Sequence, residues 1–151
     1  MLEIFVDGDA CPVKDEVERV AARHDLQVHI VSNGGLRPSR NPRFHHVIVA
    51  EGADAADDWI AAHIGSNDIA ITSDLPLAAR CLAKGAVVLN PKGEIVSQDR
   101  IGMALAMRDL SRHLREVTGR ETPHAEFAKK DRSRFLDALE NAIQKLRRNS
   151  S

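Results

Sequence analysis

Aromatic side chains are scarce in this sequence. It contains no tyrosine, one tryptophan and four phenylalanines among 151 residues. Aromatic rings are the platforms on which proteins stack the bases of single-stranded nucleic acids. If this protein binds a nucleic acid, we therefore expect it to hold mainly the phosphate backbone.

Cysteines and long apolar runs are also few. Cys11 and Cys81 are too few for a disulfide framework, and no apolar run approaches the length of a membrane span. The N-terminus lacks the basic segment, apolar segment and cleavage site that mark a signal peptide. We therefore expect a protein of the reducing cytoplasm with no membrane partner. The length suits a single domain over residues 1–148, with a frayed tail at 149–151.

Charge is distributed unevenly along the chain, although the net charge is only −1. Residues 1–107 carry 10 Lys and Arg against 15 Asp and Glu, whereas residues 108–151 carry 11 against 7. The basic C-terminal part is either a set of solvated helix faces or a basic flank beside an acidic site. A basic flank would suit a polyanionic substrate.

The hydrophobic pattern alternates between strand-like and helix-like segments. We predict strands at 2–7, 26–32, 44–50, 68–73 and 86–90, and helices at 12–24, 53–64, 75–84, 98–117 and 131–147. This alternation predicts an α/β fold with a mostly parallel five-stranded sheet covered on both faces. Ile95-Val96 are long enough only for a short edge strand. The loop 34–43 has no helical pattern, so it is either a wide crossover or the start of an antiparallel strand.

Acidic residues gather where strands end or helices begin. Asp7 and Asp9 follow the first predicted strand, Asp74 follows the fourth, and Asp54 and Asp57 lie in the first turns of the second helix. These positions share one edge of a parallel sheet, so the side chains can converge. Hard divalent cations prefer oxygen ligands, and a metal held there would serve phosphate chemistry. Helix capping alone would explain Asp54 or Asp74, but not an acid that ends a buried strand.

Polar residues on the same edge are candidates for substrate binding. They are Ser32, Asn33, Arg37, Arg40, Thr72, Ser73 and Lys92. The two arginines lie on a proline-stiffened loop, which suits bidentate contacts with phosphate, although a solvated loop explains them equally well. Cys11 lies close to two acids that oppose a thiolate, so we predict a packed thiol rather than a nucleophile.

Several motifs resemble a known family. They are VDGDACPVK (6–14), GADAADDWI (52–60), DIAITSDLPLAARCLAKGA (68–86) and an Arg/Phe-rich tail. Together they resemble the YaiI/YqxD family of uncharacterised bacterial proteins over nearly the whole chain. That family is placed among PIN-like domains, whose members are mostly metal-dependent ribonucleases. The resemblance implies a Rossmann-like three-layer α/β/α sandwich with an acidic pocket for Mg²⁺ or Mn²⁺.

The resemblance also implies roles for individual acids. Asp7 corresponds to the carboxylate that ends the first strand, and Asp74 to the acid after the fourth. Asp57 corresponds to the acid of the middle helix, with Asp54 close by, which makes these four the implied metal ligands. Asp9 stands where many related nucleases have a polar residue such as asparagine, and it completes the implied catalytic set with Asp7, Asp57 and Asp74.

Three functions compete for these residues. The leading one is a metal-dependent nuclease that acts on RNA or another nucleic acid. The second is a PIN-like module that binds nucleic acid or protein without cleaving it. The third is a phosphatase of the haloacid-dehalogenase type, with Asp7 as nucleophile and Ser32 binding phosphate. Against the third, Cys11 replaces the Thr or Val expected two residues after Asp9, and the fourth strand lacks a clear lysine followed by an acidic pair.

Overall fold

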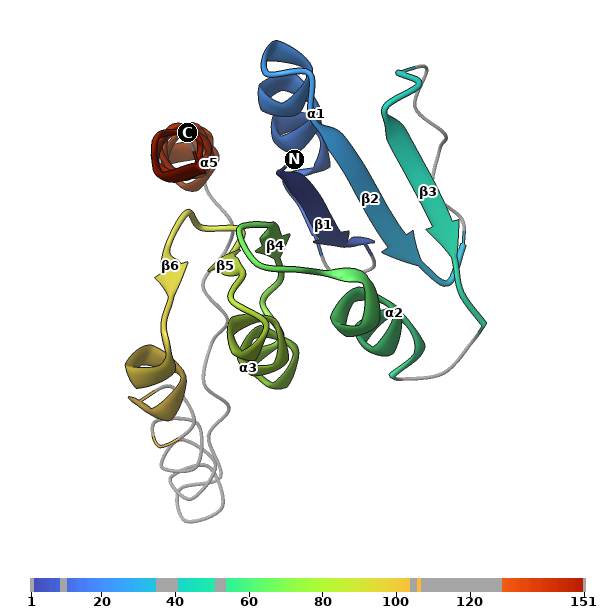
Figure 1. Ribbon diagram of the computed structural model, residues 1–151, viewed down its shortest axis with the longest axis vertical. Helices are drawn as coiled ribbons and strands as arrows, with labels where there is room; N and C mark the ends of the chain where they lie inside the picture. The colour runs from blue at the N-terminus through green and yellow to red at the C-terminus, as the bar shows by residue number, and fades with distance from the viewer. Residues whose placement is uncertain are drawn as a thin grey trace.

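A six-stranded sheet with the order β3-β2-β1-β4-β5-β6 forms the centre of the protein (Figure 1). The computed structural model describes residues 2–8, 11–34, 41–50, 54–103, 106 and 129–150. The strands are β1 (Glu3–Asp7), β2 (Gln27–Ser32), β3 (Phe44–Ile48), β4 (Ile69–Ile71), β5 (Val87–Leu89) and β6 (Ile95–Val96). Strands β1 to β5 are parallel, and β6 pairs antiparallel with β5 at one edge.

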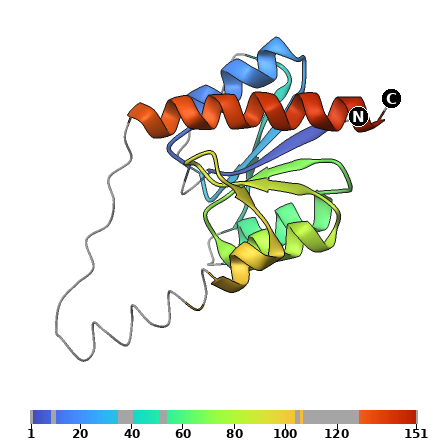
Figure 2. The ribbon, with the colours of Figure 1, turned by 90° about the vertical axis from the view of Figure 1, so that its left-hand side faces the viewer.

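Helices cover both faces of this sheet. They are α1 (Lys14–Arg23), α2 (Ala55–His63), α3 (Leu75–Ala83) and α5 (Lys129–Ser150), with further helical backbone at 98–103. Figure 2 shows α1 and α5 together on one side of the sheet, and α2 and α3 on the other. None of the helices in the described ranges is both long enough and apolar enough to cross a membrane.

The mostly parallel α/β architecture is confirmed, and several details differ from or extend the prediction. The sheet has six strands rather than five, because Ile95 and Val96 pair with Leu89 and Val88. The strand after the loop is parallel to β2, so that loop is a wide crossover. The helix expected over 98–117 is described only at 98–103 and 106, and its other residues lie outside the described part. The last helix extends beyond the predicted 131–147 at both ends.

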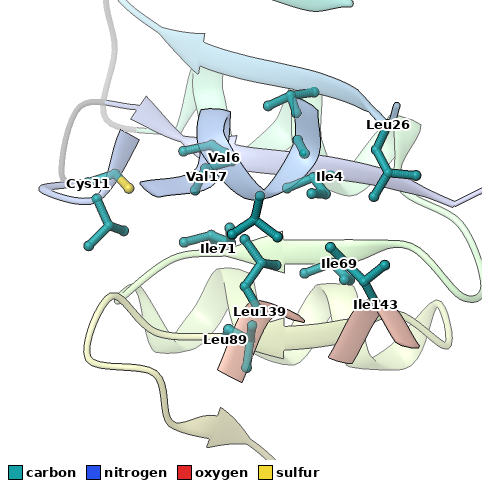
Figure 3. Packing of buried hydrophobic residues seen from close by; sticks show 14 of the residues in the cluster. Ile4, Val6, Cys11, Val17, Leu26, Ile69, Ile71, Leu89, Leu139 and Ile143 are labelled. Atoms are coloured by element: carbon teal, nitrogen blue, oxygen red, sulfur yellow. The ribbon is translucent and has the colours of Figure 1, made fainter. Parts of the chain in front are cut away.

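Two apolar clusters hold the layers together. The first lies between the sheet and helices α1 and α5, and Figure 3 shows part of it, including Ile4, Val6, Leu139 and Ile143. The second joins the opposite sheet face to α2 and α3 and includes Phe5. Alternate residues of β1 therefore serve opposite clusters, as the period of two in a strand requires. Burying each large side chain contributes about 1.5–3 kcal/mol.

The strand order reverses direction between β1 and β4. From β1 the chain continues through α1 to β2 on one side, and from β4 it continues through α3 to β5 on the other. The order of β3, β2, β1, β4 and β5 is that of a Rossmann-like sheet, in which ligands bind outside the carboxyl ends of the strands at this reversal. The ends of β1 and β4 are therefore the place to look for a site.

Candidate functional site

Asp7 ends β1 at this reversal and is half-buried. Strand alternation places it on the same side as Phe5, toward α2 and α3. The hydroxyl of Thr72, directly after β4, donates a hydrogen bond to Oδ2 of Asp7 at 3.1 Å. The same hydroxyl accepts the backbone N–H of Asp74 at 3.0 Å. Thr72 is only 3% exposed, so it is better placed to orient Asp7 than to touch a substrate.

Asp74 caps helix α3. Its Oδ1 accepts the backbone N–H of Leu77 at 2.9 Å, so the capping interpretation is confirmed for this residue. Its Oδ2 has no hydrogen-bond partner among the residues that the structure describes. The cap therefore fixes the carboxylate and leaves one oxygen for a ligand. Asp54 stands at the corresponding position of α2, but its exposed side chain makes no cap hydrogen bond, so capping does not explain it.

Asp57 shows that the acids converge. It is half-buried on α2, and its pKa is raised from 3.8 to about 6. Burial is the largest cause, followed by the negative charges of Asp74, Asp7 and Asp54. The guanidinium of Arg80 acts in the opposite direction. Like charges raise a carboxyl pKa only when they are close, so the acids of three elements lie near one another at this edge of the sheet. We call Asp7, Asp54, Asp57 and Asp74 together the acidic pocket.

Helix geometry separates Asp57 from its neighbour Asp58. The sequence pattern places Asp57 on the inward face of the helix and Asp58 about 100° away. Asp58 is exposed and forms an ion pair with Arg80 of α3 at 2.8 Å. The sequence did not indicate this arginine as part of the site. The two residues are 22 positions apart, and no local spacing connects them.

The remaining candidates have different environments. Ser32 is buried, and its hydroxyl accepts the backbone N–H of Gly34 at 3.2 Å. Strand alternation turns Ser32 toward α1, away from the side that Asp7 faces. Asn33 and Ser73 are exposed, and Lys92 is partly exposed in the turn before β6.

Three predicted site residues, Asp9, Arg37 and Arg40, lie outside the described residues. Among those that the structure does describe, no three His, Cys, Asp or Glu side chains form a group that could hold one metal ion between them. The acidic pocket is therefore a region of gathered carboxylates. These carboxylates do not form a closed set of three ligands around one ion.

Cys11 behaves as a packed thiol. It is 8% exposed in the cluster below α1 (Figure 3), and burial raises its pKa to about 11. Asp7 and Glu16 raise this pKa further, while Lys14 lowers it. A thiol with this pKa stays protonated at neutral pH, so it is no nucleophile. Cys81 is also buried, and both cysteines are free.

The raised pKa of Asp57 has a consequence for stability. The folded state holds a proton on Asp57 up to about pH 6, whereas the unfolded chain releases it near pH 4. The charged carboxylate therefore destabilises the fold above about pH 6, and this cost disappears as the pH falls toward 4. In chelator at about pH 8, Asp57→Asn should raise the melting temperature by about 2–4 °C, which corresponds to roughly 1 kcal/mol after solvent screening.

Differential scanning fluorimetry at several pH values checks this expectation. The gain should shrink as the pH approaches 4–5. Asp58→Asn is the matched control, because it removes the same charge one residue away and loses only an exposed ion pair worth about 0.5 kcal/mol. A lower melting temperature for Asp57→Asn at the alkaline end would show that the acids do not crowd each other.

Comparison with known proteins gives the family. The family model described as "Uncharacterized BCR, YaiI/YqxD family" matches residues 5–145. The chain belongs to the YaiI/YqxD family. It is 57% identical to a UPF0178 protein of Parvibaculum lavamentivorans over 148 residues, covering 98% of this chain and 97% of that protein.

Other relatives match along nearly their whole length as well. A UPF0178 protein of Rhodospirillum rubrum is 55% identical over 148 residues, covering 97% of this chain and 99% of the relative. A UPF0178 protein of Agrobacterium fabrum is 52% identical over 146 residues, covering 97% and 95%. No solved structure matches the chain significantly. The resemblance to the YaiI/YqxD family is thus confirmed, and membership among PIN-like domains remains an inference.

Proposed function

We propose that this YaiI/YqxD protein is a PIN-like, metal-dependent phosphodiesterase that acts on RNA or another nucleic acid. One observation carries the proposal. Carboxylates from β1, α2 and the β4–α3 junction gather at the strand-order reversal, where burial and, after it, the charges of Asp74, Asp7 and Asp54 raise the pKa of Asp57 to about 6. A cluster of like charges costs stability, and such perturbed groups concentrate at functional sites.

The donor set fits a hard divalent cation. All members of the acidic pocket offer carboxylate oxygens, which Mg²⁺ and Mn²⁺ prefer. Mg²⁺ usually keeps several waters and takes only one or two carboxylates directly, so a closed group of three ligands is not required. Asp7, Asp57 and Asp74 would hold the ion directly or through water, with Asp54 at the exposed side. When bound, such an ion neutralises phosphoryl charge and lowers the pKa of water.

The protein itself holds the carboxylates in place. The Thr72 hydroxyl fixes Asp7 relative to the backbone of Asp74, and the α3 cap fixes the side chain of Asp74. Asp57 lies on α2, which packs on the side of the sheet that Asp7 faces. Preorganised groups of this kind need no rearrangement when charge develops on a phosphate.

The phosphatase alternative loses support from the placement of Ser32. A phosphate-binding hydroxyl would have to face the same pocket as the nucleophile. Ser32 is 2% exposed, accepts a hydrogen bond from Gly34 and lies on the opposite side of the sheet from Asp7. The protonated state of Cys11 likewise leaves no thiol nucleophile.

Cleavage of an end-labelled single-stranded RNA tests the proposal. The purified protein should cleave it in Mg²⁺ or Mn²⁺, and an excess of EDTA should stop the reaction. Asp7→Asn should retain RNA binding and lose cleavage, because the amide keeps the shape but not the charge. A labelled single-stranded DNA of the same sequence shows whether the 2′-hydroxyl is needed.

Two results would overturn the proposal. Tight RNA binding by the wild-type protein, with no cleavage in either metal, would identify a binding module. Turnover of a small phosphomonoester, with a phosphoaspartate trapped at Asp7, would identify a phosphatase.

A further inference from the structure

Helix α5 begins at the same edge of the molecule as the acidic pocket. Near its start, Arg132 donates from Nη1 to the carbonyl oxygen of Pro12, which precedes α1, at 2.8 Å. Near its end, Arg147 donates from Nη2 to the carbonyl oxygen of His24, which follows α1, at 2.7 Å. The two helices are therefore parallel, and Figure 2 shows α5 starting at the end of the molecule opposite to the chain termini. That end is where β1 delivers Asp7.

Cations without an ion pair to any described residue gather around this edge. They are Lys14 at the start of α1, Lys92 in the turn before β6, and Lys129, Lys130 and Arg134 in the first two turns of α5. We call these five residues the basic rim. By contrast, Arg23, Arg80, Arg100 and Arg132 all have carboxylate partners.

Several acids near the basic rim are already paired or buried. Glu16 is paired with Arg132 at 3.1 Å, and Glu94 is paired with Arg100. Asp131, the only acid among residues 129–134, is 6% exposed and faces inward. Exposed Asp15 and Asp137, beside Lys14 and Arg134, offset part of the charge, and the five cations of the rim outnumber them.

The basic rim lies at the same edge of the sheet as the acidic pocket, on the side of the sheet that carries α1 and α5. Lys14 and Asp7 both act electrostatically on the thiol of Cys11, so the two charges flank the same short segment. The turn that carries Lys92 also contacts α5, because a Cβ atom on Gly93 would lie only 2.7 Å from the carbonyl oxygen of Arg134. Three elements thus present cations at the edge of the sheet where the carboxylates gather.

We infer that the basic rim binds the phosphate backbone of a nucleic-acid strand and leads it to the acidic pocket. This inference rests on the proposed function, which makes the acidic pocket the site of cleavage. Binding of a strand to the rim does not itself require cleavage. Carboxylates alone repel a polyanion, so an acidic phosphodiesterase site needs a cationic approach beside it. Lysines and arginines on an exposed surface hold phosphates without regard to sequence.

Among the residues that the structure describes, no exposed aromatic ring is part of this surface. Phe5 stacks on His29 with ring centroids 4.8 Å apart, and Trp59 stacks on His63 at 3.9 Å. Phe5 belongs to the apolar cluster under α2 and α3, against which Trp59 packs, on the other side of the sheet from α5. Recognition through the basic rim should therefore depend on salt and hardly at all on base sequence.

Fluorescence anisotropy in EDTA, where no cleavage can occur, tests the inference with labelled oligouridylate and oligoadenylate. The triple variant Lys129→Gln, Lys130→Gln and Arg134→Gln should weaken binding of both strands about 100-fold near 0.1 M salt. It should also reduce the slope of log K against log salt by about 2, since each phosphate contact on a single strand contributes about 0.7.

A matched triple variant separates the basic rim from net charge. Arg19→Gln, Lys84→Gln and Lys145→Gln remove the same charge from exposed residues in α1, directly after α3 and in α5 that are not part of the rim. This control should change affinity by no more than about threefold, because salt screens distant charges. Equal losses in the two triple variants, or no RNA binding by the wild-type protein, would overturn the inference.

Failure of the inference and failure of the proposed function give different results. Asp57→Asn should bind RNA in EDTA at least as tightly as the wild-type protein, because it removes a negative charge beside the strand. If the wild-type protein binds through the rim but cleaves nothing, the nuclease proposal fails and the binding surface stands. If cleavage occurs but the rim variant binds and cleaves normally, the strand approaches from another side.

Discussion

An Asp57→Asn variant is expected to cleave RNA at least about 100-fold more slowly than the wild-type protein in saturating Mg²⁺, the size of effect seen when one electrostatic group of an active site is removed. The negative charges of Asp74, Asp7 and Asp54 all act on Asp57, and each raises its pKa after the larger effect of burial. Its amide replacement keeps the shape of the side chain and removes one anionic oxygen from the pocket. The loss should appear in single-turnover rates, which exclude effects on product release.

Asp58→Asn provides the control for this experiment. Both variants lose one carboxylate from the same turn of α2, but Asp58 is exposed and pairs with Arg80. Its cleavage rate should stay within about threefold of the wild-type rate, because an exposed pair contributes little energy. In chelator, Asp57→Asn should have a higher melting temperature than Asp58→Asn. Equal loss of activity in both would contradict the assignment of Asp57.

The convergence of the acids could be predicted because it depends on topology. A residue that directly follows a parallel strand lies at the carboxyl edge whatever the side-chain packing, so Asp7 and Asp74 had to share an edge. Asp68 illustrates the same rule at the opposite edge of the sheet, where the parallel strands begin. It precedes β4, and its two oxygens accept the backbone N–H groups of Glu3 at 3.0 Å and Gly65 at 2.9 Å. An acid at that end of a strand joins backbone segments and is remote from the site.

Contacts between distant elements could not be predicted in this way. The pairing of Asp58 with Arg80 depends on how α2 and α3 lie against each other, and the pattern within each helix carries no such information. The Thr72 hydroxyl was expected to contact substrate, but its burial and its two hydrogen bonds depend on the neighbouring strand. Sequence periodicity shows which face of a helix is buried, and the partner of that face comes only from the tertiary fold.

The same limit applies to the sheet and to α5. The direction of β3 stayed open because a loop without helical pattern is compatible with either pairing, and β6 was too short to count with certainty. The apolar stripe of Phe135, Leu139 and Ile143 predicted a buried helix face, and all three side chains are fully buried. Their packing beside α1, which places the basic rim at the same edge of the sheet as the acidic pocket, could not be read from that stripe.

The docking of α5 should depend strongly on Gly93. This residue has φ +83°, and a Cβ atom there would lie 2.7 Å from the carbonyl oxygen of Arg134 and 2.9 Å from the backbone nitrogen of Phe135. Gly93→Ala therefore combines a left-handed backbone, which costs about 1 kcal/mol, with a clash against a helix that cannot yield locally. We expect a total loss of about 3 kcal/mol, since overpacking adds about 1–3 kcal/mol.

Substitutions of two other glycines separate the cost of the left-handed backbone from the cost of the clash. The free energy of unfolding of each variant is measured in urea. Gly34→Ala meets the same backbone restriction at φ +118°, but its nearest neighbour would be a side-chain atom of Ile48 at 3.9 Å, so it should cost only about 1 kcal/mol. Gly102→Ala adds a methyl group in a helical segment with nothing within 4 Å and should be neutral or stabilising by up to about 1 kcal/mol. If Gly93→Ala cost no more than Gly34→Ala, the turn would not hold α5. A loss confined to Gly93→Ala, accompanied by weaker RNA binding in EDTA, would instead tie the position of the basic rim to this single close contact between the turn and the helix.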